Sequence, residues 1–184
     1  MKLFFENIAK REKGKLIYKK TKPKTAYALQ ISMVSFEEYY KLIIPYKNQK
    51  IIIIHQINPS LTGLFKVNLN LKKLNINFDI ESNNHFIQLF RPNSDSVKVK
   101  CNNKDFKSFI KGNEHFKSLV KLINETEFTP LIYTTYKSKE LTIISEYHTS
   151  FENNTTMIEP LIKFYKSLID KILIMDKINS SISN

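Results

Sequence analysis

Cysteine is nearly absent from this sequence: Cys101 is the only one among 184 residues. A single thiol cannot form an internal disulfide, so the chain does not resemble the small secreted domains that disulfides stabilise, and a reducing compartment is expected. Glycine is also scarce, with three residues in all. Glycine-rich loops that cradle phosphate groups are therefore excluded, and turns that need a positive φ must use other residues, such as asparagine.

Long hydrophobic runs are missing as well. The longest aliphatic run, residues 51–54, is far shorter than the roughly 18 to 20 apolar residues that a transmembrane helix needs. Near the N-terminus, Glu6 and Asn7 interrupt the apolar residues before they reach the length of a signal-peptide core. The sequence therefore predicts a cytoplasmic protein without a transmembrane segment.

Arginine is the third scarce residue, since Arg11 and Arg91 are the only arginines among 29 basic residues. The formal net charge of +12 is therefore carried almost wholly by lysine. Lysine acts as a hydrated point charge and lacks the planar fork with which arginine grips phosphate or guanine. The chain is also rich in isoleucine and asparagine. A general bias toward Lys, Asn and Ile thus accounts for part of the charge.

Apolar residues, by contrast, are plentiful. The chain is 42% hydrophobic and contains 13 phenylalanines and 9 tyrosines. At this length about 70% of the unfolded surface is buried on folding, which is enough for one core. We therefore predict a single α+β domain over residues 1–178, in which residues 1–24 form a basic N-terminal helix and tract, followed by a flexible polar tail at residues 179–184.

Strand periodicity is clearest between residues 65 and 80. Apolar and polar residues alternate over 65–71 and again over 74–80, as in strands with one buried face. The phase changes at Lys72 and Lys73, which predicts a turn between two paired antiparallel strands. Further strands are predicted at residues 50–57, 86–90, 97–101, 128–136 and 140–147, and residues 15–18 could form a brief strand. Residues 27–34 have the length of a strand, although their alanines leave a helix possible. The result is a mainly antiparallel sheet of about six to eight strands.

Helical spacing appears in four places. Apolar residues recur at helical intervals near the N-terminus, in residues 36–43 and in a pair of segments between 106 and 123. Ser35 and Glu38 form a capping-box pattern for the second of these. A longer apolar stripe runs over residues 158–172 and follows a second capping box at Thr156 and Glu159. We expect this long C-terminal helix to pack across the sheet.

The positive charge is concentrated between residues 10 and 24, where eight basic residues and one acidic residue, Glu12, give a net charge of +7. The basic residues of this N-terminal basic tract are Lys10, Arg11, Lys13, Lys15, Lys19, Lys20, Lys22 and Lys24. We hypothesise a non-enzymatic protein that engages an acidic protein surface through the tract.

Three other interpretations of the tract stay open. Nucleic acid could bind the same lysines, with Tyr18 and Tyr27 available for stacking on bases. An anionic membrane surface could attract the tract together with Phe4, Phe5 and Ile8. The tract could also be a solvated basic face without a partner.

Catalytic chemistry has weaker support. Glu146 and His148 share a strand face and could act as acid and base in a hydrolase-like enzyme. Cys101 continues the apolar row of Val97 and Val99, which favours a buried thiol over a nucleophile. The four histidines lack the spacing of a zinc site. We therefore predict no metal and no cofactor.

Overall fold

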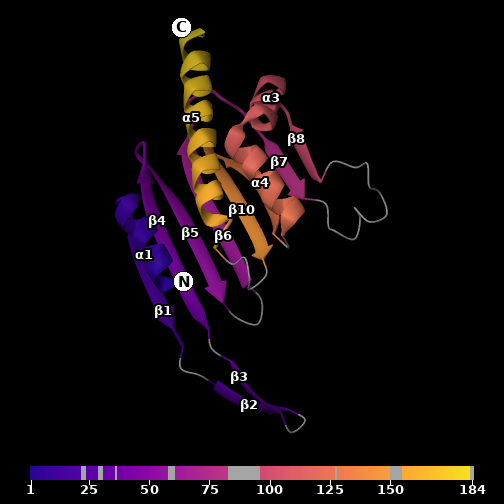
Figure 1. Ribbon diagram of the computed structural model, residues 1–184. Coiled ribbons are helices and arrows are strands. Elements are labelled where there is room, and N and C mark those ends of the chain that lie inside the picture. The colour runs from indigo at the N-terminus through magenta and orange to yellow at the C-terminus, as the bar shows by residue number, and fades with distance from the viewer. Residues whose placement is uncertain are drawn as a thin grey trace.

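The computed structural model describes residues 1–21, 24–28, 31–35, 37–57, 61–82, 96–126, 128–149 and 155–182. Its main sheet has eight antiparallel strands in the order β1-β4-β5-β6-β10-β9-β7-β8 (Figure 1). These strands are β1 (Lys15–Lys20), β4 (Glu38–Tyr46), β5 (Gln49–Ile57), β6 (Leu61–Asn70), β7 (Phe78–Ser82), β8 (Val97–Cys101), β9 (Thr129–Lys137) and β10 (Glu140–Thr149). A separate two-stranded hairpin is formed by β2 (Lys24–Ala28) and β3 (Ile31–Ser35).

Four described helices cover one face of the main sheet (Figure 1). They are α1 (Lys2–Arg11), α3 (Lys104–Gly112), α4 (Glu114–Glu125) and α5 (Ile158–Ile182). The architecture confirms the predicted α+β fold with a mainly antiparallel sheet and a long C-terminal helix. None of these helices is long and apolar enough to cross a membrane.

The core lies between the sheet and the helices. Phe65, Val67 and Leu69 of β6 are at most 1% exposed, because every second residue of the strand points to the helix side. From α5, Tyr165 contacts this row and its hydroxyl donates to the carbonyl oxygen of Phe65. Phe5 of α1 stacks on the ring of Tyr40 at the other end of the sheet. The two periodic segments and the long helix thus share one interior, as predicted.

The predicted pairing of residues 65–71 with 74–80 is wrong. β6 pairs with β5 and β10, and β7 pairs with β9 and β8, so the β9–β10 hairpin separates them. The strand β7 also begins later than predicted, at Phe78. The phase change at Lys72 and Lys73 marks a bend whose backbone N–H groups donate to Asp176 of α5. This side-chain anchor, and not a hairpin ladder, turns the chain.

The helix predicted at residues 36–43 is also wrong, because Glu38–Tyr46 is strand β4. Tyr40, Leu42 and Ile44 are at most 1% exposed, so the buried residues alternate with a period of two. Glu38 does not cap a helix. Its carboxylate pairs with the ammonium of Lys20 on the neighbouring strand at 2.8 Å.

The remaining elements follow the sequence predictions with shifted bounds. Residues 27–34 are split between β2 and β3, and the predicted strand at 86–90 lies outside the described residues. Helix α5 reaches Ile182, so it continues into the segment predicted to be a polar tail. The paired helices α3 and α4 and the hairpin β9–β10 are present as predicted.

Candidate functional site

The N-terminal basic tract does not form one surface. Lys10, Arg11 and Lys13 lie at or just after the end of α1, and the guanidinium of Arg11 donates to Glu159 of α5 at 3.0 Å. These three exposed residues therefore lie near the helices that cover the sheet.

The rest of the tract follows strand β1 and divides between the two faces of the sheet. Lys15 and Lys19 point away from the helices, whereas Lys20 pairs with Glu38. Lys22 lies outside the described residues, as does the side chain of Lys24. Of the tract lysines whose side chains the structure describes, Lys15 and Lys19 thus reach the sheet face that no described helix covers.

Strand register adds three lysines from other strands to that open face. Ile17 of β1 pairs with Lys41 of β4, and Ile52 of β5 pairs with Lys66 of β6. The basic face, as we define it, consists of Lys15, Lys19, Lys41, Lys50 and Lys66. Among the described residues, none of the five has a carboxylate within ion-pair distance. No acidic residue occupies an outward position of β1, β4, β5 or β6.

Aliphatic side chains fill the space between these lysines. The aliphatic cluster, as we define it, consists of Ile17, Ile43, Ile52, Ile54 and Leu64, all of them partly exposed. The outward aromatic residue on these four strands is Tyr39. The other half of the open face, on β10, β9 and β7, carries acidic residues, one of which, Glu81, pairs with Lys100 at 2.7 Å. Acidic residues therefore lie on one half of the open face, and the basic face with its aliphatic cluster lies on the other.

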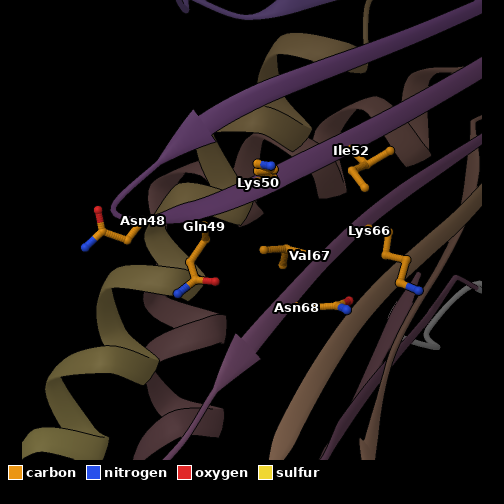
Figure 2. Close-up of a pocket in the computed structure, with 7 residues that line it drawn as sticks. All are labelled: Asn48, Gln49, Lys50, Ile52, Lys66, Val67 and Asn68. Atoms are coloured by element: carbon orange, nitrogen blue, oxygen red, sulfur yellow. The ribbon is translucent and has the colours of Figure 1, made fainter.

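A cleft opens within the basic face where β5 and β6 diverge. Their pairing ends at Ile52 and Lys66. Beyond this point, among the described strands, residues 49–51 pair with β4 alone and residues 67–70 pair with β10 alone. The β5–β6 cleft has a volume of about 340 Å³ and is shown from the strand side, with α5 behind it, in Figure 2. It is lined by Asn48, Gln49, Lys50, Ile52, Lys66, Val67 and Asn68.

Two carboxylates of helix α5 anchor the segments that adjoin the cleft. Asp170 accepts a hydrogen bond from the Tyr46 hydroxyl at 3.0 Å and pairs with Lys47 at 2.7 Å, which fixes the β4–β5 turn. Burial and the hydrogen bond to Asp170 both raise the pKa of Tyr46, so this phenol stays a donor. Asp176 fixes the bend that follows β6.

A second polar group lies inside the core. The His55 Nδ1 is 2.9 Å from the Tyr147 hydroxyl, while His55 Nε2 and Ser145 Oγ are buried without a hydrogen-bond partner among the described residues. Burial lowers the pKa of His55 to about 4, so the ring is neutral near neutral pH. His55 and Ser145 are both 0% exposed. A substrate therefore has no access to them in this conformation.

The Glu146 and His148 pair lies on the acidic half of the open face. Both residues are exposed on β10 and share a strand face, as the sequence predicted. Glu146 accepts a hydrogen bond from Tyr133 at 2.9 Å, and no bond joins it to His148 among the interactions of the described residues. The hydrolase-like activity stays a hypothesis.

Cys101 ends strand β8 and is partly exposed, unlike the buried Val99 in the same row. Its sulfur accepts a hydrogen bond from the backbone N–H of Asn103 at 3.4 Å. Across the part of the chain that the structure describes, no group of three or more His, Cys, Asp or Glu side chains is placed to hold a metal ion.

Comparison with known proteins finds no match among family models, curated proteins or solved structures.

Proposed function

We propose that this protein is a non-enzymatic, cytoplasmic binding protein that engages an acidic protein surface through the basic face of its sheet. The supporting observation is the set of five lysines that surround the aliphatic cluster and have no carboxylate partner within the described part of the chain. Unpaired charges of one sign attract an oppositely charged surface and orient its approach. Partly exposed aliphatic side chains supply the apolar contact that holds a protein partner once it has docked.

The side chains of the basic face favour a protein partner over nucleic acid. Single-stranded nucleic acid is held by aromatic side chains on which the bases stack, and Tyr39 is the outward aromatic residue on these strands. Phosphate and guanine are gripped best by arginine, and all the cations here are lysines. Aliphatic side chains between lysines instead suit a surface on which carboxylates alternate with apolar residues.

Charge reversal on the basic face tests this proposal. The triple variant Lys15→Glu, Lys19→Glu, Lys41→Glu is expected to weaken binding of a fluorescein-labelled peptide of alternating glutamate and valine by about tenfold or more, since three attractions become repulsions. Fluorescence anisotropy measures the dissociation constant. Binding to the unmodified protein is also expected to weaken as salt rises.

The matched control reverses three exposed lysines on the helices: Lys104→Glu, Lys117→Glu and Lys163→Glu. It changes the net charge equally and is expected to leave the affinity within about twofold, because long-range effects are screened. Equal losses in both variants, or no binding of the acidic peptide, would contradict the proposal. Tighter binding of a single-stranded oligonucleotide of the same charge, lost in the same variant, would favour nucleic acid as the partner.

A further inference from the structure

We infer that the β5–β6 cleft receives an extended acidic segment of the partner protein, which pairs as an additional strand between β5 and β6. This inference rests on the proposed function and specifies the conformation of the partner and the place where it binds. It requires free strand edges, enough space and side chains that select the segment.

Free strand edges are present on both sides of the cleft. Residues 49–51 of β5 and 67–70 of β6 remain extended and are paired on their outer sides only. In a strand, every second residue points its N–H and C=O groups to the same side. Such groups need a partner, and an extended peptide supplies one by adding a strand. Each wall therefore offers a short template for main-chain pairing.

Space for the segment is provided by the cleft, which opens beyond the last paired residues, Ile52 and Lys66. The cavity of about 340 Å³ lies within the range of ligand pockets, and α5 lies behind it (Figure 2). Its lining comes from β5, β6 and the turn before β5, so an inserted segment contacts both walls.

Side chains around the cleft select the sequence of the segment. Lys50 and Lys66 lie on the open face, whereas Ile51 and Val67 are buried toward the core. Successive residues of an inserted strand point to opposite faces, so its outward residues meet ammonium groups and its inward residues meet aliphatic ones. Opposite charges across neighbouring strands stabilise the pairing. The expected segment therefore alternates carboxylates with small aliphatic residues.

Amide hydrogen exchange tests the insertion directly. The probe is the alternating glutamate and valine peptide, added to the full chain. On binding, the amides of residues 49–51 and 67–70 that point into the cleft are expected to exchange at least about tenfold more slowly, because they gain main-chain partners. Binding of the peptide without slower exchange at these residues overturns the insertion and leaves the proposed function standing. Absence of binding overturns both.

A backbone-modified probe separates strand pairing from charge attraction. The same peptide with alternate main-chain nitrogens methylated keeps every carboxylate but loses the donors on one edge. It is expected to bind at least about tenfold more weakly, because each lost hydrogen bond leaves a backbone carbonyl of the strand edge without its donor. Equal affinity of the two peptides contradicts insertion.

Neutralising the two cleft lysines provides a further readout. The variant Lys50→Gln, Lys66→Gln is expected to bind the unmodified peptide about fivefold more weakly than the variant Lys15→Gln, Lys19→Gln does. Both variants remove the same charge from the basic face, so the second serves as the control. An equal loss of peptide affinity in the two double variants contradicts a special role of the cleft, while the proposed function still holds.

Discussion

Gly63→Ala is expected to destabilise the folded protein by about 3 kcal/mol or more, an effect at the upper end of overpacking in a core. A Cβ at Gly63 would lie 2.0 Å from the Cζ atom of Tyr147. The tyrosine has no room to withdraw, because it is 1% exposed and its ring contacts Phe65 and Phe128. Its hydroxyl is also bonded to His55. Urea denaturation at neutral pH measures the loss.

Two companion variants test the cause. Gly112→Ala places a Cβ in open space near the end of α3, so it is expected to be neutral or to stabilise the helix by up to about 1 kcal/mol. Combining Gly63→Ala with Tyr147→Leu is expected to cost less than the sum of the two single changes, since the clash disappears with the ring. A Gly63→Ala protein as stable as the original would show that the core can repack around the added carbon.

Local periodicity is the part of this fold that the sequence reveals. Strands β6 and β10 and helix α5 each carry a long apolar pattern of their own, and the side chains that this pattern marks are buried. In strand β4 the local pattern is ambiguous. Its tyrosines and isoleucines fit helical spacing and strand alternation at once, and pairing with β1 and β5 decides between them.

Strand order cannot be derived from such local patterns. The segments that form β6 and β7 are neighbours in the sequence, yet the β9–β10 hairpin lies between them in the sheet. A hairpin formed by residues far along the chain competes for the same strand edges. The longer pairing wins, since β6 meets β10 over ten residues. Pairing between strands that are far apart in the sequence leaves no signature in the local periodicity of either strand.

The sequence predicts that the candidate site is rich in lysine, but it does not predict which strands carry those lysines. The N-terminal basic tract contributes Lys15 and Lys19, whereas Lys41, Lys50 and Lys66 join them only through strand register. The described residues of the tract are divided between two sides of the molecule. A cleft between two strands that diverge leaves no local trace in the sequence of either strand.

Asp176→Asn is expected to lower the free energy of unfolding by about 2 to 3 kcal/mol at neutral pH, because charge-assisted hydrogen bonds are among the stronger ones. The carboxylate of Asp176 is 6% exposed and accepts hydrogen bonds from the backbone N–H groups of Lys72, Lys73 and Leu74 at 2.9 to 3.1 Å. An amide in its place presents a donor toward these donors. Asp170→Asn is the matched control on the same helix, and its more exposed ion pair is expected to contribute about 1 kcal/mol or less.

The pH dependence of this difference identifies the carboxylate as its source. Burial alone would raise the pKa of Asp176, but the three backbone donors outweigh burial and hold the pKa below the ordinary value of 3.8. The stabilisation is therefore complete above that ordinary value and is lost as the pH falls through the lowered pKa. Urea midpoints of the original protein and of Asp176→Asn are accordingly expected to converge below about pH 4. A difference that stays constant down to about pH 2 would mean that packing, and not the charge on Asp176, ties α5 to the bend after β6.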